Sequence, residues 1–287
     1  MDIGFVANGQ PAEVLERAAR LGLEGVELCF RTNGPCDLER WTADDTRRVV
    51  DLVASTGARI LTVASFWDRH LSPDPAVRQQ AAANMRRAIE LAPQLGTRVV
   101  TCMAFGDPTQ RPEAQVQMFG QVFGEYARIA EDNGVRIGIE NYPAVRQEPG
   151  LIITNLGSTP ALFEMLFDAV PSKAVGMEYD PSHYYWQGAD YVDVIRRFAD
   201  RMVFMHAKDT QVFKDRLGQV GIYGQGWWRY RLPGLGEVDW DAIARALAEI
   251  GYRTGLVIEH EDPVFSGERF EEGLAIGARF LRQVLKQ

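Results

Sequence analysis

The chain alternates along its length between short apolar runs and longer stretches with helical periodicity. Residues 3–7 form the first apolar run. The next stretch opens at Pro11, a residue favoured in the first turn of a helix, and places Val14 and Ala18 on one face before Gly22. Eight such units follow one another, at about 36 residues per unit for 287 residues. Because strand–helix–strand crossovers join parallel strands, the pattern predicts an α/β fold.

Eight strand-then-helix units predict a single (β/α)8 TIM-barrel domain over residues 1–287, since about 250 residues plus insertions is typical of that architecture. A doubly wound open sheet of similar composition is the alternative. The longest irregular stretch is residues 210–237, after the seventh predicted strand. Loops of this length in compact domains usually serve a function or are disordered, so we expect a lid or an interface loop there.

Composition excludes several classes of protein. The formal charge is −8 and no basic stretch is present, whereas phosphate contacts need clustered Lys and Arg, so nucleic acid is not expected as a partner. No apolar run approaches the roughly 18 residues that span a bilayer, and residues 1–10 do not resemble a secretory signal. The three cysteines form no CxxC pair. We therefore expect a cytoplasmic protein with no membrane partner and no disulfide framework.

Four successive predicted strands end in side chains that bind metals. These residues, in chain order, are Glu140, Asp180, His206 and Glu259. The active site of a barrel lies at the C-terminal ends of its strands, and neighbouring strands are about 4.7–4.9 Å apart, so the four side chains can converge. Three carboxylates and an imidazole gather only if their pKa values rise or a cation lies among them. An oxygen-rich set with one imidazole favours Mn²⁺, Mg²⁺ or Co²⁺ over structural zinc, and we expect Mn²⁺.

The strings IENY, EYDPSH, HAKD and VIEHED, in this order and at these strand ends, resemble the xylose isomerase-like TIM-barrel family over essentially the whole chain. That family includes ketose 3-epimerases, inosose isomerases and dehydratases, hydroxypyruvate isomerases and, more distantly, endonuclease IV. Its most specific element here is Asp-x-x-His, at Asp180 and His183. The resemblance implies that His183 holds a substrate hydroxyl or carbonyl, and that Glu140 and Glu259 act as an acid/base pair. It also implies four metal ligands: Glu140, Asp180, His206 and Glu259.

The predicted function is that of a divalent-metal-dependent sugar isomerase or epimerase. Such chemistry removes a proton next to a carbonyl and leaves an enediolate, whose charge a metal can stabilise. A lyase or dehydratase is the alternative, in which the same enolate of a keto sugar or 3-keto-glycoside expels a β-leaving group. An AP endonuclease is disfavoured because four histidines are too few for its three-zinc site. A non-catalytic sugar-binding barrel is the remaining hypothesis.

Several other side chains are predicted to contact the substrate, a sugar or sugar derivative. His70 follows the third predicted strand, with a solvated loop position as its alternative. Lys208 is expected to steady a ligand carboxylate first and to contact substrate second. In the 210–237 insertion, Trp227 is expected to close one side of the pocket while Arg229 or Arg231 points inward; a homo-oligomer contact is the alternative.

Two further features qualify this interpretation. Ketose 3-epimerases that resemble this chain carry an Arg soon after the histidine of the seventh strand, but residues 207–213 contain none. A free ketohexose is therefore not the expected substrate. Glu27 lies inside a run that should be buried, and we expect it either in an ion pair that packs the barrel or bound to a sugar hydroxyl or Lys208.

Overall fold

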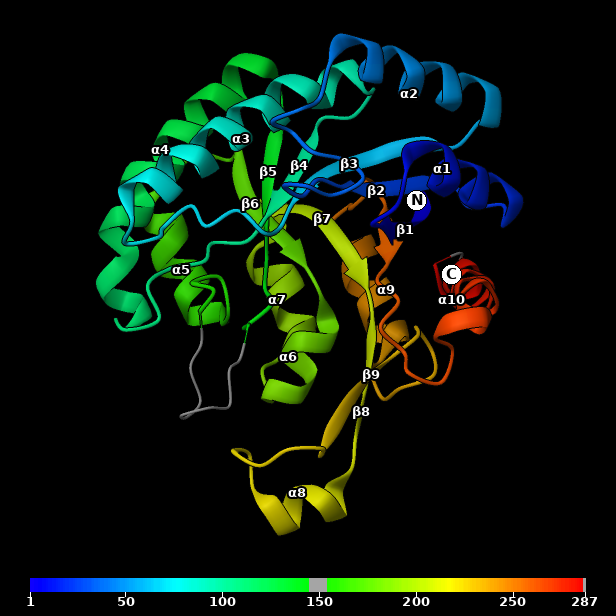
Figure 1. Ribbon diagram of the computed structural model, residues 1–287. Coiled ribbons are helices and arrows are strands. Elements are labelled where there is room, and N and C mark those ends of the chain that lie inside the picture. The colour runs from blue at the N-terminus through cyan, green and yellow to red at the C-terminus, as the bar shows by residue number, and fades with distance from the viewer. Residues whose placement is uncertain (145–153, 286–287) are drawn as a thin grey trace.

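Eight parallel strands close into a barrel in the computed structural model, which describes residues 1–144 and 154–285 (Figure 1). The strands are hydrogen-bonded in chain order, and the last one, β10, pairs with β1 to close the ring. The barrel strands are β1 (Ile3–Ala7), β2 (Gly25–Cys29), β3 (Arg59–Ser65), β4 (Val99–Cys102), β5 (Arg136–Glu140), β6 (Val175–Tyr179), β7 (Met202–Ala207) and β10 (Leu256–Ile258). The (β/α)8 prediction is confirmed, and the open sheet is excluded.

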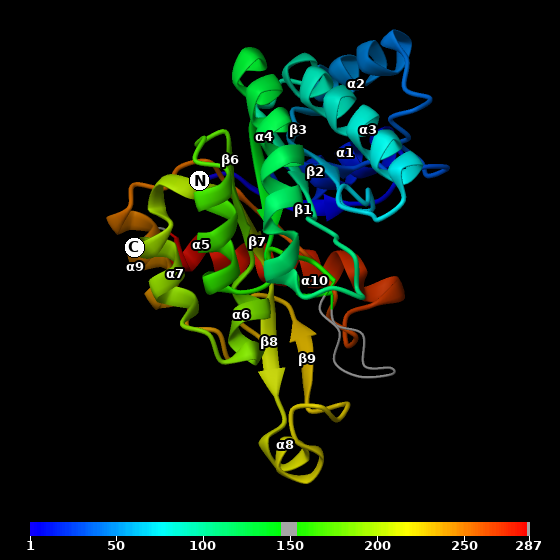
Figure 2. The same cartoon turned by 90° about the vertical axis from the view of Figure 1, so that its left-hand side faces the viewer.

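Helices cover the outside of the barrel, and their bounds follow capping chemistry in the sequence (Figures 1 and 2). Thr42 and Asp45 form a capping box at the start of α2, which ends at Gly57 with a positive φ of 75°. The covering helices are α1 (Pro11–Arg20), α2 (Ala43–Thr56), α3 (Pro75–Gln94), α4 (Val116–Asn133), α5 (Pro160–Ala169), α7 (Tyr191–Arg197), α9 (Trp240–Glu249) and α10 (Phe270–Val284).

The segment after β6 forms two short helices. The first, α6 (Pro181–Gln187), begins directly after the strand, and α7 follows it. Asp180 caps α6, its side chain accepting a hydrogen bond from the backbone N–H of Ser182, and Pro181 occupies the first helical position. Gly188, with φ of 74°, ends α6. This short helix holds the region after Asp180 at the barrel mouth.

The insertion after β7 is an ordered arm instead of an irregular loop. β8 (Asp209–Val212) and β9 (Trp228–Arg231) pair as an antiparallel hairpin, with α8 (Lys214–Val220) between them. Both views show α8 projecting away from the barrel at the far end of the hairpin (Figures 1 and 2). Trp227 is buried against its own chain, at Trp186 and Trp228.

A single buried carboxylate anchors the base of this arm. Asp209 is fully buried, and its two oxygens accept hydrogen bonds from the backbone N–H groups of Thr210, Gly234 and Val238 and from the indole N–H of Trp240, at 2.8–3.0 Å. The arm is therefore fixed where it leaves the barrel.

Across the described residues, none of the helices combines the length and the apolar character that a bilayer crossing requires.

Candidate metal centre

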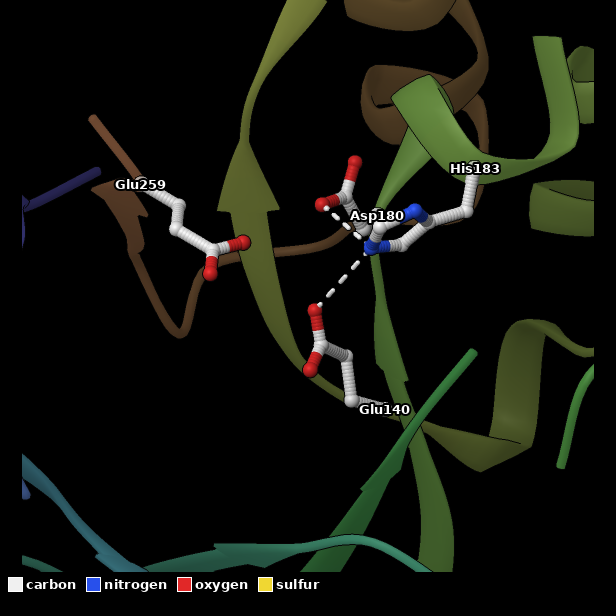
Figure 3. A group of neighbouring side chains, drawn as sticks. All are labelled: Glu140, Asp180, His183 and Glu259. Atoms are coloured by element: carbon white, nitrogen blue, oxygen red, sulfur yellow. Dashed lines mark hydrogen bonds and ion pairs between the residues drawn. The ribbon is translucent and has the colours of Figure 1, made fainter. Parts of the chain in front are cut away.

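Three side chains from the ends of β5, β6 and β10 and one from α6 converge at the barrel mouth. One ligand atom from each of Glu140, Asp180, His183 and Glu259 lies within 4.8 Å of the others. Figure 3 shows that Glu259 faces the other three from the side of β10. His183 Nε2 lies 3.3 Å from Asp180 Oδ2 and 3.4 Å from Glu140 Oε1. Three of the four predicted ligands are thus brought together, with His183 beside them.

Buried amide side chains hold the backbone around this cluster. Asn155 donates hydrogen bonds to the carbonyl oxygens of Glu140 and Tyr142 and accepts one from the backbone N–H of Ala104. Asn141 accepts a hydrogen bond from the Asp180 backbone N–H at 2.6 Å and donates to its carbonyl oxygen at 2.8 Å. The ends of β5 and β6 are therefore locked to each other just where Glu140 and Asp180 leave the sheet.

His206, the fourth predicted ligand, lies against the same cluster and also reaches deeper into the barrel. Its Nδ1 atom is 3.1 Å from Glu140 Oε1 and 3.2 Å from Glu259 Oε2. Its Nε2 atom is 2.7 Å from Glu27 Oε2 and 3.2 Å from Glu178 Oε1. Two buried carboxylates can thus fix the ring so that Nδ1 faces the mouth, as outer partners of metal-binding histidines commonly do.

The contacts of Glu27 decide between its two expected roles. It lies in an ion pair with His206 inside the barrel and accepts a hydrogen bond from Thr101 at 2.5 Å. The expected contact with Lys208 is absent from the described contacts; Lys208 instead reaches the carboxylates of the mouth. Its ammonium Nζ is 2.5 Å from Glu259 Oε2, 3.0 Å from Glu261 Oε2 and 3.2 Å from Asp180 Oδ2.

Electrostatics in the cluster follow from burial and from these neighbours. Burial, and then the charge of Glu259, raise the pKa of Glu140 to about 7. Burial opposes ionisation of Glu259, but the nearby cations Lys208 and His206 prevail and lower the pKa of that carboxyl. Burial and then the charge of Lys208 lower the pKa of His183 well below its ordinary value. The two glutamates, at similar positions in the mouth, therefore prefer different protonation states.

Several buried carboxylate oxygens in and below the cluster accept no hydrogen bond from any described residue: Asp180 Oδ2 and both oxygens of Glu178. Their nearest positive or imidazole neighbours lie at ion-pair distance, with Lys208 Nζ 3.2 Å from Asp180 Oδ2 and His206 Nε2 3.2 Å from Glu178 Oε1. Burying such atoms is costly unless a cation or donor reaches them. An oxygen-rich group with imidazole nitrogens beside it fits a divalent cation. A cavity of 640 Å³ adjoins the cluster, and its lining includes Glu259 and Glu261.

Three predicted substrate contacts lie elsewhere. His70 is buried against α4, with its Nδ1 3.2 Å from the Tyr126 hydroxyl and its ring edge-on to Phe123. Arg229 donates to the side chain of Gln211 and lies over the ring of Phe213. Arg231 forms an ion pair with buried Asp262, at 2.9 Å. None of the three contacts the cluster among the described residues, and their contacts with substrate stay predictions.

Sequence reasoning missed Tyr230, which does reach the cluster. Its hydroxyl oxygen is 2.9 Å from His183 Nδ1, and Lys208 Nζ lies 4.3 Å from the centre of its ring. Because side chains alternate along a strand, Trp228 and Tyr230 share one face of β9 while Arg229 and Arg231 share the other. The alternation in WRYR was a usable signal, but the segment had been interpreted as irregular.

Comparison with known proteins agrees with this architecture. The family model for the xylose isomerase-like TIM barrel matches residues 15–284. An uncharacterised protein, MJ1311 of Methanocaldococcus jannaschii, is 30% identical over 158 residues, which are 53% of this chain and 47% of that protein. An inosose dehydratase of Clostridium perfringens is 25% identical over 167 residues, 53% of this chain and 56% of the enzyme. The chain therefore spans about half the length of these curated relatives.

Solved structures with the same fold cover nearly the full chain. A D-psicose 3-epimerase, determined in the presence of D-fructose, has a TM-score of 0.77 at 17% identity and is covered completely, as is this chain. The IolI protein with a bound zinc atom has a TM-score of 0.76 at 19% identity, over 100% of this chain and 98% of that one. At these identities the likeness establishes the fold alone.

Proposed function

The chain belongs to the xylose isomerase-like TIM barrel family, and on that premise we propose that it is a divalent-metal-dependent sugar isomerase or epimerase. The observation that carries the proposal is the set of buried carboxylates whose ligand atoms converge at the barrel mouth with unsatisfied oxygens. Relatives and structural neighbours named as epimerases and dehydratases support an enzyme that acts on a sugar or sugar derivative.

The proposed metal ligands are those of the strand ends: Glu140, Asp180, His206 and Glu259. His183 lies within reach of the same centre and is the alternative imidazole ligand. Mn²⁺ is the proposed ion, with Mg²⁺ or Co²⁺ as alternatives, because most of the donors are carboxylate oxygens. When bound, the ion would polarise the carbonyl and hydroxyl oxygens of the sugar and stabilise negative charge that develops on them.

Glu140 and Glu259 would move the proton. They reach the cluster from β5 and β10, on different sides of it (Figure 3). The lowered pKa of Glu259 keeps this carboxylate ionised, which is the form that a group removing a proton next to the carbonyl must have. Because the pKa of Glu140 is raised to about 7, this group can hold a proton near neutral pH and return it to the enediolate. His183 would hold a sugar oxygen.

A second candidate is a lyase or dehydratase that uses the same first step. The enediolate, or the enolate of a 3-keto-glycoside, would then expel a β-leaving group instead of taking a proton at a neighbouring carbon. The inosose dehydratase relative favours this alternative specifically.

One experiment distinguishes the two candidates. The protein is incubated with Mn²⁺ in deuterated water with a panel of keto sugars and 3-keto-glycosides, and the products are followed by NMR. Deuterium next to the carbonyl together with a rearranged or inverted sugar supports the isomerase or epimerase, and release of a leaving group supports the lyase. The Asp180→Ala variant is the control for metal-dependent turnover. If no sugar of the panel incorporates deuterium, the result counts against both candidate functions.

A further inference from the structure

The insertion arm contacts the candidate centre through one hydroxyl group. Tyr230, on β9 of the arm, places its hydroxyl oxygen 2.9 Å from His183 Nδ1. The opposite nitrogen of that ring, Nε2, lies 3.3 Å from Asp180 Oδ2 and 3.4 Å from Glu140 Oε1. His183 is therefore held at both ends, by a phenol on the arm side and by carboxylates on the mouth side.

The chemistry of these partners determines which nitrogen carries the hydrogen. Asp180 Oδ2 is a buried carboxylate oxygen that accepts no hydrogen bond from the described residues, so Nε2, 3.3 Å from it, is best satisfied as a donor. The Tyr230 hydroxyl can donate as well as accept, and it meets Nδ1, the nitrogen that a neutral imidazole then leaves as an acceptor. His183 is fully buried, so water does not compete for either position.

We propose that Tyr230 is a positioning residue that donates to His183 Nδ1 and thereby keeps the imidazole hydrogen on Nε2, facing the carboxylates and the sugar. His183 would then offer an N–H donor to a sugar oxygen instead of a lone pair to the metal. This inference deepens the proposed function, and its kinetic part rests on it. The insertion would then contribute to the site by fixing the tautomer of His183. In that role the insertion would not need to place an arginine in the site.

The ring and the hydroxyl of Tyr230 have separable contacts. The ring lies edge-on to His183, with centroids 5.3 Å apart and an interplanar angle of 87°, and it also packs on the Lys208 ammonium. Tyr142 packs on His183 at a centroid distance of 5.1 Å. Tyr230→Phe removes the hydroxyl while the aromatic packing stays, so it isolates the hydrogen bond to Nδ1.

Nitrogen NMR of the imidazoles tests the tautomer directly. The chain has only four histidines, so His183 can be assigned in protein labelled with ¹⁵N-histidine. In the wild-type protein we expect the hydrogen of His183 on Nε2, and in Tyr230→Phe we expect a mixed or reversed tautomer. A hydrogen on Nδ1 in the wild-type protein, or the same tautomer in both proteins, would overturn the proposal. The wild-type spectrum alone shows whether the hydrogen of His183 is on Nδ1, so this test does not depend on whether the variant folds.

A matched control separates this effect from a general loss of hydroxyl groups. Tyr185→Phe removes a hydroxyl that donates to Glu237 at the base of the same arm, away from His183. We expect Tyr230→Phe to lower kcat by about 10- to 100-fold with a smaller change in KM and unchanged metal content, since outer partners of a site commonly have effects of this size. Tyr185→Phe should leave kcat and the His183 tautomer unchanged. A drop in metal content in Tyr230→Phe would instead make His183 a metal ligand and contradict the donor role.

The two proposals fail in different ways. If no sugar exchanges deuterium with the wild-type protein, the proposed function fails, while the NMR result still decides the tautomer. If exchange is normal and Tyr230→Phe retains both wild-type kcat and the wild-type tautomer, the positioning role fails and the proposed function stands.

Discussion

Two buried aspartates follow neighbouring strands of the barrel and have opposite surroundings. Asp209, after β7, accepts four hydrogen bonds, three from backbone N–H groups and one from an indole. Asp180, after β6, accepts one from Ser182 through Oδ1, while its Oδ2 accepts none from the described residues. Both side chains are fully buried. Burial therefore does not distinguish them; the supply of fixed donors does.

We infer from this difference that Asp209 is a structural carboxylate and that Asp180 belongs to the proposed site. A buried charge is tolerated when N–H donors surround it, as around Asp209, which ties the arm to the barrel. Asp180 Oδ2 instead faces the Lys208 ammonium, with Nζ at 3.2 Å, and the imidazole of His183, with Nε2 at 3.3 Å. A charge that lacks fixed donors leaves room for a ligand with positive charge, and perturbed carboxylates of this kind gather at functional sites. The predictions below test this contrast.

The largest effect is expected from removing proton transfer within the cluster. Glu140→Gln and Glu259→Gln keep the side-chain shape but abolish the acid or base, so each should lower kcat by about 10²- to 10⁴-fold, more than it lowers metal or substrate affinity. The measurement is steady-state turnover together with deuterium incorporation from solvent. Normal incorporation in both variants would place the base elsewhere, with Glu261 or His183 next.

The second effect concerns stability at the other aspartate. Asp209→Ala leaves four buried N–H donors without an acceptor, and each orphaned group costs about 1–3 kcal/mol, so the free energy of unfolding should fall by about 4 kcal/mol or more. Asp180→Ala, in the metal-free protein, should change it less, because it removes one helix-cap hydrogen bond while Lys208 keeps its ion pairs with Glu259 and Glu261. Urea unfolding of both variants is the measurement. Equal destabilisation by the two would remove the contrast on which the site assignment depends.

A smaller effect is a pH dependence of stability in the metal-free protein. The pKa of Glu140 is raised to about 7 in the folded chain, whereas an unfolded glutamate titrates near ~4.3. The unfolded state therefore releases this proton first, so Glu140 favours the folded state fully below pH ~4.3 and that contribution is lost as the pH rises towards 7. Thermal unfolding of chelator-treated protein across this range should show the loss, and Glu140→Gln should reduce it. Glu16→Gln, at an exposed helical position, is the matched control. An unchanged pH profile in Glu140→Gln would contradict the raised pKa.

Much of this arrangement was predictable from the sequence because it depends on local periodicity. Short apolar runs end in Glu140, Asp180 and Glu259, and the closure of a parallel barrel brings such strand ends together. His206 was found by the same rule. Its inner partners were harder to find: Glu27 was noticed without its partner, and Glu178 lies within a strand where one carboxylate carries no signal of its own.

What the sequence did not predict depends on contacts between segments distant in the chain. Tyr230 was missed because β9 pairs with β8 across an intervening helix, and only that pairing reveals which face of WRYR turns toward His183. His70 was placed correctly on a loop after a strand, but packing against Tyr126 draws it away from the mouth. Local pattern thus locates the strand ends, while tertiary packing selects which neighbouring side chains join them.

The central claim is that the cluster around Asp180 binds a divalent cation and the shell around Asp209 does not. Titration of chelator-treated protein with Mn²⁺, followed by calorimetry and thermal unfolding, tests it most directly. We expect one ion per chain and a gain in stability that reaches about 2.7 kcal/mol at a free-ion concentration of 100 times Kd. Asp180→Ala should abolish most of the binding, and Asp209→Asn, if folded, should retain it. Absence of binding by the wild-type protein, or undiminished binding by Asp180→Ala, would contradict the account and leave Lys208 as the cation of the cluster.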